Sequence, residues 1–458
     1  MAGARRAFIV TFGCQMNEYD SGRLGELLAA RGWQPAATRE EADLIFFNTC
    51  SVRAKAAQRV LNHLEEVRAL KRRKPSLIVA VGGCVAEQEG QALLDRVPWL
   101  DLVAGPQCLP LLPGILEKMD GSRRTLTGPG RQPAWSQANL KALGVTAPVS
   151  AASPLAAGVT IMQGCDNYCA YCVVPYLRGP ELSRPAGEIL EEAAALLAGG
   201  ARDLTLLGQN VNAYGRGLAG IPGGPSGFPD LLKAVAALGV ERLRFVTSHP
   251  KDFSPELVEL FAALPPLGDS LHLPVQSGSE AVLKAMGRGY SREEYLGLVR
   301  ALRRARPGLA LSTDVIVGFP GETEADFEAT LDLAETVGFD AMFSFKYSDR
   351  PGVAAAGFPN KVPEEEKARR LTRLQTRQKA ISLARNQAHI GQVLEVLVER
   401  VSGRRPGQLT GRARNHKLVH FDGPPKLIGQ MVPVLITSAG PASLQGQSEA
   451  LEQSSSGP

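Results

Sequence analysis

The sequence lacks the segments that anchor a protein in a membrane or direct it out of the cell. None of its apolar runs approaches the roughly 18 residues that a membrane-spanning helix needs. Behind Arg5 and Arg6 the apolar stretch covers only 7–12, which is too short for the core of a secretory signal, and no small-residue cleavage site follows. We therefore expect a cytoplasmic protein without a membrane segment. In that compartment thiols stay reduced and structural disulfides are rare.

Aromatic residues are few, and the positive and negative charges nearly balance. The 458 residues hold 51 Lys and Arg against 46 Asp and Glu, a net charge of +5, and only 6% are aromatic. With 44% hydrophobic and 21% charged residues the chain can still bury several cores, which excludes global disorder. The length predicts about three domains of roughly 150 residues each.

Cysteine is scarce as well, because the chain has only seven. In a reducing compartment cysteines point to metal binding or catalysis before disulfides. Cys14, Cys50 and Cys84 each end a short apolar run within the first 105 residues, and a helical stretch follows each run. Short runs that are apolar on both faces and alternate with helices predict a parallel sheet covered on both sides, here a Rossmann-like α/β domain over 5–120.

This topology predicts that the three cysteines lie close together. The carboxyl ends of parallel strands meet at one edge of the sheet. Three cysteines at the same position of three successive units favour a three-thiolate metal site. The alternative is that they are core residues, since buried cysteine is a common small hydrophobe. Cys108 fits no such pattern, and we expect it to be an ordinary packed or solvent-facing thiol.

The middle of the chain returns to alternating strand and helix patterns. After a linker expected over 121–157, six such units predict a partial (βα)6 barrel over 158–388, which ends in an amphipathic helix beginning at Pro363. The Gly- and Pro-rich segment 215–227 is expected to be a surface loop. Capping patterns mark three helix starts in this region: Ser254 with Pro255, Ser291 with Glu294, and Thr323 with Asp326.

The end of the chain has the alternating pattern of strands that face one core. The segment 391–446 predicts a small all-β barrel, and the polar, serine-rich segment 447–458 predicts a disordered tail. The small barrel holds seven Lys and Arg against three Asp and Glu, a balance that suits phosphate contacts with RNA. The candidate RNA-binding residues are Arg404, Arg405, Arg412, Arg414 and Lys417. The preceding helix offers a further basic face, for which solvation is the more common role: Arg369, Arg370, Arg373 and Arg377.

The strongest chemical signal is the CxxxCxxC pattern of Cys165, Cys169 and Cys172, directly after the first barrel strand. Three thiolates on one loop can hold a soft metal centre. Zinc is one alternative, but its structural sites take four ligands, and no fourth Cys or His lies near this loop in the sequence. A [4Fe-4S] cluster bound by three cysteines leaves one iron open to a substrate or cofactor. The position is the C-terminal face of the barrel, where barrel enzymes have their active sites.

This pattern after the first barrel strand resembles the signature of radical S-adenosylmethionine (SAM) enzymes. The wider sequence is similar to one branch of the methylthiotransferase family over about residues 7–446. The matching segments are 11–17, 48–53, 83–84, 172–176, 207–214, 272–279 and 312–323. The similarity is interrupted at the 215–227 loop, at Cys108, and at His416 and His420.

The resemblance implies a domain order and two kinds of cofactor. It implies that the amino-terminal domain binds an auxiliary [4Fe-4S] cluster through its three cysteines, that the middle domain is a radical SAM core, and that the last is an RNA-binding module called TRAM. The cluster on the CxxxCxxC cysteines would bind SAM at its open iron and cleave it to a radical. The auxiliary cluster would present sulfur, which a second SAM methylates.

The implied reaction is the methylthiolation of carbon 2 of N(6)-isopentenyladenosine at position 37 of tRNA. Its partners would be the tRNA anticodon stem-loop, an electron donor such as flavodoxin or ferredoxin, and a sulfur source, with the enzyme as a monomer. The nearest alternatives are methylthiotransferases that act on threonylcarbamoyl-adenosine of tRNA or on a ribosomal-protein aspartate. An alternative of another class is a non-enzymatic RNA-binding iron–sulfur sensor. Sensors commonly use four protein ligands, whereas each group here offers three.

Five polar residues at predicted strand ends are candidates for the SAM or adenine pocket: Gln209, Asn210, His272, Gln276 and Asp314. The carboxyl ends of barrel strands surround the active site, so side chains there can reach a bound cofactor. The alternative is that these side chains only cap the loops that follow the strands.

Overall fold

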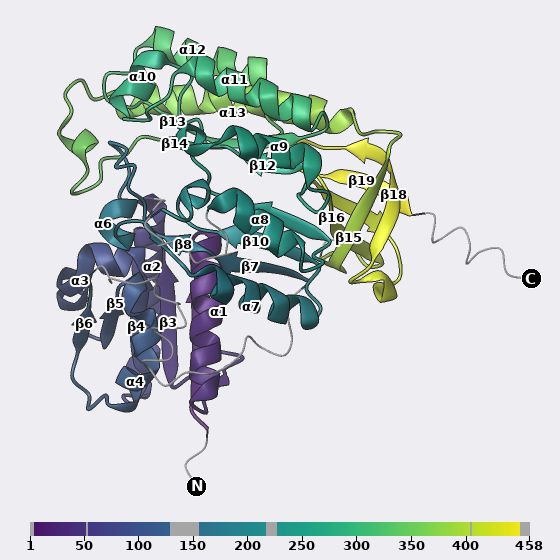
Figure 1. Ribbon diagram of the computed structural model, residues 1–458. Coiled ribbons are helices and arrows are strands. Elements are labelled where there is room, and N and C mark those ends of the chain that lie inside the picture. The colour runs from purple at the N-terminus through teal and green to yellow at the C-terminus, as the bar shows by residue number, and fades with distance from the viewer. Residues whose placement is uncertain (1–3, 52–53, 129–154, 217–226, 404, 449–458) are drawn as a thin grey trace, which may run out of the picture.

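The computed structural model describes residues 4–51, 54–128, 155–216, 227–403 and 405–448 (Figure 1). Most of the predicted linker over 121–157, of the loop over 215–227 and of the tail over 447–458 lies outside these residues, as does Arg404. Within the described ranges, no helix combines the length and the apolar character needed to cross a membrane.

The amino-terminal domain is a six-stranded parallel sheet with the order β2-β1-β3-β4-β5-β6. Its elements are β1 (Arg6–Thr11), α1 (Gln15–Ala30), β2 (Gln34–Pro35), β3 (Leu44–Thr49), α2 (Ala54–Arg73), β4 (Ile78–Gly83), α3 (Cys84–Arg96), β5 (Leu102–Ala104), a 3-10 helix (Pro106–Leu111), α4 (Leu112–Glu117) and β6 (Arg124–Leu126). Every residue of β3 is buried. Phe46 packs in the core shared with α1 and α4, whereas Phe47 packs in the core shared with α2 and α3. The predicted sheet with two covered faces is therefore confirmed.

The middle domain contains two three-stranded parallel sheets, β7-β10-β11 and β12-β13-β14. The strands are β7 (Ala156–Thr160), β10 (Asp203–Leu207), β11 (Arg242–Phe245), β12 (Ser270–His272), β13 (Ala310–Val317) and β14 (Ala341–Lys346). A bridge between Leu243 and Leu267 brings the two sheets together between β11 and β12. The result is the predicted partial barrel of six parallel strands, the scaffold for a site at their carboxyl ends.

Helices cover the outside of this barrel (Figure 1). They are α7 (Ala186–Ala198), α8 (Phe228–Ala236), α9 (Pro255–Ala263), α10 (Glu280–Ala285), α11 (Arg292–Ala305), α12 (Glu324–Val337) and α13 (Glu364–Gln387), and a small pair, β8 (Met162–Gln163) with β9 (Leu182–Ser183), flanks the short α6 (Val174–Arg178). Both predicted capping boxes are present, at Ser291 with Glu294 and at Thr323 with Asp326. Ser254 also caps α9 as predicted.

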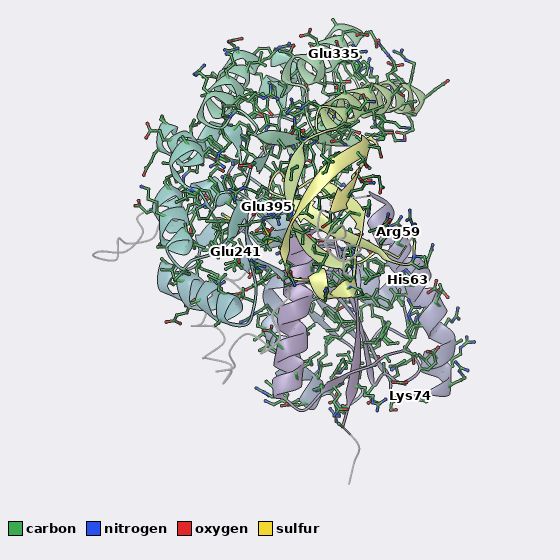
Figure 2. The ribbon with its side chains drawn as sticks, turned by 90° about the vertical axis from the view of Figure 1, so that its right-hand side faces the viewer. Arg59, His63, Lys74, Glu241, Glu335 and Glu395 are labelled. Carbon is green, nitrogen blue, oxygen red and sulfur yellow. The ribbon has the colours of Figure 1, made fainter. Side chains whose placement is uncertain are left out.

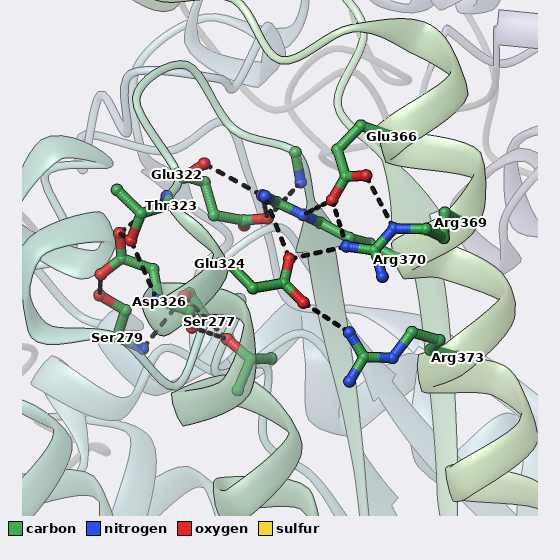
Figure 3. Close-up of polar contacts among 12 residues, drawn as sticks. Ser277, Ser279, Glu322, Thr323, Glu324, Asp326, Glu366, Arg369, Arg370 and Arg373 are labelled. Atoms are coloured by element: carbon green, nitrogen blue, oxygen red, sulfur yellow. Dashed lines mark hydrogen bonds and ion pairs between the residues drawn. The ribbon is translucent and has the colours of Figure 1, made fainter.

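The four arginines of α13 that offered a basic face fasten this helix to α12 and to the loop before it. Figure 3 shows three of them: Arg369, Arg370 and Arg373. All four pair with acidic side chains: Arg369 with Glu324 and Glu366, Arg370 with Glu322, Arg373 with Glu324 and Glu328, and Arg377 with Glu335. Their charges are thus balanced within the fold. The structure favours a structural role for this face over contact with RNA.

The carboxy-terminal module is a closed five-stranded barrel with the order β15-β16-β17-β19-β18, as predicted for a small all-β barrel. Its strands are β15 (Val393–Val401), β16 (Gln408–Ala413), β17 (Leu418–Asp422), β18 (Met431–Ala439) and β19 (Leu444–Ser448). Figure 2 shows this barrel against the middle domain, with Glu395 of β15 and Glu241, which directly precedes β11, labelled.

The turn between β16 and β17 docks the small barrel on the amino-terminal ends of the core strands. Lys417 lies 2.7 Å from Asp340, the residue before β14, and both side chains are buried. Arg414 lies 3.4 Å from Asp269, the residue before β12. In the opposite direction, Arg242 of β11 donates a hydrogen bond of 2.6 Å to the carbonyl of Arg412. The small barrel therefore sits at the end of the core opposite to the expected active site.

Replacing Asp340 by Asn is expected to destabilise the protein by about 3 kcal/mol, because Lys417 would keep a buried charge without its partner. Thermal unfolding and limited proteolysis of the small barrel would show the loss. Asp422→Asn is the matched control, because Asp422 pairs with Arg405 in an exposed bridge of 2.7 Å, and exposed bridges add little stability. Equal effects of the two substitutions would contradict a buried, stabilising role for the pair of Asp340 and Lys417.

This buried pair also predicts a pH dependence of the docking. Burial alone would raise the pKa of Asp340, but the Lys417 ammonium, together with the Arg385 guanidinium and a hydrogen bond from the Leu311 amide, lowers this pKa below its usual value. A carboxylate with a lowered pKa stabilises the folded state above its unfolded pKa of about 3.9. That stability is lost as the pH falls from there through the folded-state pKa. The acid sensitivity of the docking should therefore decrease in Asp340→Asn.

Candidate functional site

The structure brings Cys14, Cys50 and Cys84 together at one edge of the amino-terminal sheet. They follow β1, β3 and β4, whose carboxyl ends are in register, and the Cys14 and Cys50 thiols are hydrogen bonded. Cys84 is close enough to Cys14 for their charges to interact. Gly13 makes the approach possible: it adopts a φ of +125°, and a Cβ there would lie 2.2 Å from the Cβ of Cys50.

The three thiols differ in acidity. The hydrogen bond with Cys50 lowers the pKa of Cys14 to about 6, which is opposed by burial and assisted by the nearby Arg178 guanidinium. Burial raises the pKa of Cys84. The thiolate is the form that binds metal, so Cys14 is prepared to act as a ligand at neutral pH.

The middle domain completes this amino-terminal site. Arg178, at the end of α6, is buried and donates hydrogen bonds to Asp20 Oδ2 at 2.9 Å and to Asn17 Oδ1 at 3.5 Å. It is also hydrogen bonded to Cys84. The Arg350 guanidinium interacts electrostatically with Cys50. Both arginines follow carboxyl-terminal ends of the core barrel, so the cysteines of the first domain face the active-site end of the second.

Cys165, Cys169 and Cys172 lie on the loop that follows β8. The three thiols are near enough for Cys172 to interact electrostatically with the other two. Burial raises the pKa of Cys165 to about 11 and that of Cys172 to about 12, so as free thiols they stay protonated. A positively charged metal centre would convert such thiols to ligating thiolates.

Gly164 fixes the start of this loop. It adopts a φ of +75°, and a Cβ there would lie 1.9 Å from the carbonyl oxygen of Pro180. The next amide, that of Cys165, donates a hydrogen bond of 3.2 Å to the carbonyl of Gly179. Only glycine therefore allows the cysteine loop to pack this closely against the segment that follows α6.

Each of the two cysteine groups offers three thiols, which is the donor composition of an iron–sulfur cluster with one open iron. In the part of the chain that the structure describes, no three His, Cys, Asp or Glu side chains converge to hold one metal ion. A [4Fe-4S] cluster spreads its thiolates over separate irons, and three thiolates leave the fourth iron open. Both cysteine groups have this composition.

The five pocket candidates form two groups at the core. Gln209 Oε1 accepts a hydrogen bond of 2.6 Å from the amide of Gly164, and Asn210 Nδ2 donates to Glu181 and Asp252 at 2.9 and 2.8 Å. Gln209 Nε2 and Asn210 Oδ1 are buried and have no hydrogen-bond partner among the described residues. These two side chains thus offer unused polar atoms beside the cysteine loop.

The second group lies on β12, β13 and the loop after β12. His272 Nε2 lies 3.4 Å from Asp314 Oδ2, and its Nδ1 lies 2.9 Å from Ser312 Oγ. The centre of the Phe343 ring on β14 lies 5.9 Å from the centre of the His272 ring. Phe343 is 52% exposed. Gln276 instead contributes its backbone, since its amide donates a hydrogen bond of 2.9 Å to the carbonyl of Asp314.

The candidate RNA-binding residues differ in their exposure and in their ion-pair partners. Arg412, Arg414 and Lys417 take part in the docking of the small barrel or in its own contacts, and the side chain of Lys417 is 9% exposed. Arg405 is exposed and pairs only with the equally exposed Asp422 among the described residues. Arg414 and Lys417 thus contact the middle domain through their side chains, whereas the Arg412 side chain pairs with Glu399 inside the small barrel. Arg405 is the most exposed of the four described candidates.

Arg178, Arg288 and Arg350 are functional candidates that the sequence analysis missed. Their contacts with Cys84, Cys169 and Cys50 connect segments that are distant in the sequence. No local pattern marks such residues. Their only signal was a position in loops after barrel strands or beside the cysteine motif.

Comparison with known proteins agrees with the order of three folds along the chain. The family models that match are the uncharacterized protein family UPF0004 over residues 6–105, the radical SAM superfamily over 159–334 and the TRAM domain over 387–448. Among solved structures, the radical SAM methyltransferase TsrM from Kitasatospora setae has a TM-score of 0.55 and 16% identity, covering 77% of both chains. At that identity the likeness shows the fold alone.

The curated relatives are far more similar. A protein of Syntrophobacter fumaroxidans is 48% identical over 446 residues, 97% of this chain and 95% of the relative. A protein of Thiobacillus denitrificans is 48% identical over 450 residues, 98% of this chain and 99% of the relative. Both are named tRNA-2-methylthio-N(6)-dimethylallyladenosine synthase.

The parallel partial barrel with a three-cysteine loop after its first strand defines this protein as a radical SAM enzyme. Membership of that superfamily implies a [4Fe-4S] cluster and SAM as cofactors. Within it, the chain belongs to the tRNA-2-methylthio-N(6)-dimethylallyladenosine synthase family.

Proposed function

We propose that this enzyme replaces the hydrogen on carbon 2 of N(6)-isopentenyladenosine, at position 37 of tRNA, by a methylthio group. The observation that supports this most directly is the joining of two three-cysteine sites, one per domain, through Arg178 at the end of the helix that follows the CxxxCxxC loop. A single three-cysteine site suffices for radical formation. A second one, facing the same end of the barrel, suits an enzyme that must also deliver sulfur. The names of the relatives support the substrate.

In this proposal Cys165, Cys169 and Cys172 hold the cluster that binds SAM. A bound cluster with an open iron supplies the electron that splits SAM, which gives a radical able to break an aromatic C–H bond. Gln209 and Asn210, with unused buried polar atoms beside the loop, orient the cofactor.

Cys14, Cys50 and Cys84 hold the auxiliary cluster, at which sulfur is presented. Arg178 orients this site, because it connects α1 to the core through Asp20. In this proposal the adenine is placed beside His272 and Asp314, which pair across the neighbouring strands β12 and β13. Gln276 shapes this site through its backbone.

In this proposal the enzyme is a cytoplasmic monomer that binds the anticodon stem-loop of tRNA. An electron donor such as flavodoxin or ferredoxin reduces it, and a separate source supplies the sulfur. We also propose five segments for the chain. They are an amino-terminal α/β domain over 5–120, a linker over 121–157, a radical SAM core with its trailing helix over 158–388, a TRAM barrel over 391–446 and a tail over 447–458.

Mass spectrometry of tRNA nucleosides tests the substrate. A strain that lacks the gene should lose 2-methylthio-isopentenyladenosine, accumulate isopentenyladenosine, and regain the product when the gene is restored. Persistence of the product in the deletion strain would reject the substrate assignment. Loss of the methylthio group from threonylcarbamoyl-adenosine or from a ribosomal-protein aspartate instead would favour one of the other methylthiotransferase activities.

A further inference from the structure

Arg288 is a buried cation whose partners include no carboxylate. Arg288 is only 4% exposed to solvent. The guanidinium donates to Tyr290 OH at 3.1 Å, Tyr171 OH at 3.3 Å and the carbonyl of Pro274 at 2.8 Å, and its remaining partner is Cys169 Sγ at 3.5 Å. No Asp or Glu of the described residues forms an ion pair with it. A buried charge needs a nearby opposite charge or it destabilises the fold.

Other buried arginines of this protein show how the fold usually meets this need. Arg178, Arg184 and Arg370 each have a carboxylate within 2.9 Å, from Asp20, Glu192 and Glu322. Arg242 lies at the domain interface, donates to two main-chain carbonyls, and has Asp203 and Glu395 in electrostatic range. For Arg288, the group among its contacts that can become an anion and bind metal is the thiol of Cys169.

A second donor faces the same sulfur. His249 Nε2 lies 4.0 Å from Cys169 Sγ. Its other nitrogen, Nδ1, accepts a hydrogen bond of 3.2 Å from the backbone amide of Lys251, so the proton of the neutral ring is on Nε2 and points at the sulfur. The backbone of His249 is also held in place, because its amide donates a hydrogen bond of 2.9 Å to Asn212 Oδ1.

The backbone holds Arg288 in place against the cysteine loop. It lies between Gly287 and Gly289, which both adopt a positive φ, of +70° and +69°. The amide of Ala170, next to Cys169, donates a hydrogen bond of 2.9 Å to the carbonyl of Met286. The segment that carries Arg288 therefore moves with the cysteine loop, and its guanidinium is pre-positioned at the sulfur.

We propose that Arg288, assisted by His249, is a positioning residue that acts as the counter-ion of the Cys169 thiolate and raises the reduction potential of the cluster at this loop. The inference rests on the proposed ligation by Cys165, Cys169 and Cys172. N–H donors to a ligand sulfur and a nearby positive charge favour the more negative, reduced state. The step concerned is the entry of one electron from the external donor, and no bond is made or broken in it.

The test is a potentiometric titration of the reconstituted full-length protein, followed by electron paramagnetic resonance. Arg288→Gln, which keeps a hydrogen-bond donor but removes the charge, should make reduction at least about tenfold less favourable, a shift of about 59 mV to lower potential for one electron. Arg288→Lys, which keeps the charge, should recover part of the shift. Arg292→Gln is the matched control, since Arg292 donates to the carbonyls of Gly278 and Ala329 and pairs with Asp332, away from the cysteines.

This titration distinguishes a failure of the inference about Arg288 from a failure of the proposed cluster ligation. The signal of the core cluster is the one that disappears when Cys165, Cys169 and Cys172 are replaced together; if no signal disappears, the proposed ligation fails. If that signal does disappear, an unchanged reduction potential in Arg288→Gln overturns the role of Arg288. Should that variant not retain its cluster, His249→Phe decides, because it removes the Nε2–H donor that faces the same sulfur. A lowered potential in His249→Phe supports the inference, and the wild-type potential overturns it.

Discussion

A variant in which Cys165, Cys169 and Cys172 are all replaced by alanine is expected to bind about half of the iron of the unmodified protein, about four atoms instead of eight. It should also release no 5'-deoxyadenosine from SAM under reducing conditions. The reason is the division of the thiols between two sites: this variant removes every ligand of the core loop and leaves Cys14, Cys50 and Cys84 in place. Iron analysis and liquid chromatography of the SAM products measure both effects.

Cys108→Ala is the matched control for this variant. Cys108 lies in the 3-10 helix before α4, is half-buried, and packs against the core around Leu109. Burial raises its pKa, so it stays protonated and does not compete for iron. Its replacement should leave the iron content and SAM cleavage unchanged. A triple variant that keeps its full iron content, or that still cleaves SAM, would contradict the assignment of the core loop.

The parts of this fold that follow from local patterns could be predicted from the sequence. Short runs that are apolar on both faces require a sheet covered on both sides, and β3 is buried along its whole length. The capping box of Ser291 with Glu294 depends on residues only three apart, so the sequence contains all of it. The convergence of Cys14, Cys50 and Cys84 follows from parallel topology, because every strand of such a sheet ends at the same edge.

The partners of charged residues could not be predicted in the same way. An excess of Lys and Arg in the small barrel suggested RNA contact, but a count of charges does not say which cations meet an acid elsewhere in the chain. Lys417 meets Asp340, which is 77 residues away in the sequence. Arg178 meets Asp20 across 158 residues. Only the packing of one domain on another brings such groups together, and a local motif does not encode it.

Around the CxxxCxxC loop, the sequence predicts the candidate ligands but not the charged residues beside them. The sequence identifies Cys169 as a candidate ligand from the CxxxCxxC spacing alone. It does not identify Arg288, which reaches that sulfur from 119 residues further along the chain. The ligands of a cofactor are thus more predictable than the residues that set its electrostatic environment, because the ligands share one loop and their surroundings come from several.

Replacing Cys14, Cys50 and Cys84 by alanine is expected to separate the two halves of the reaction. The core loop and its cluster remain, so SAM should still be cleaved to 5'-deoxyadenosine under reducing conditions. The site that presents sulfur is lost, so no 2-methylthio-isopentenyladenosine should form on tRNA. Both products can be measured in one reaction with tRNA that contains isopentenyladenosine, by mass spectrometry of the nucleosides and of the SAM fragments.

The packing of Cys84 makes a second variant necessary. Cys84 is buried against Val173, Leu177 and Val353 of the core, so its replacement could disturb the contact between the domains as well as the ligand set. Cys14 directly precedes α1 and belongs to none of the apolar cores formed by the described residues, so Cys14→Ala removes one thiolate with little loss of packing. It should abolish the methylthio product and keep SAM cleavage. If Cys14→Ala still forms the product, sulfur reaches the base by a route that does not need the amino-terminal cluster, because two thiolates do not complete its ligand set.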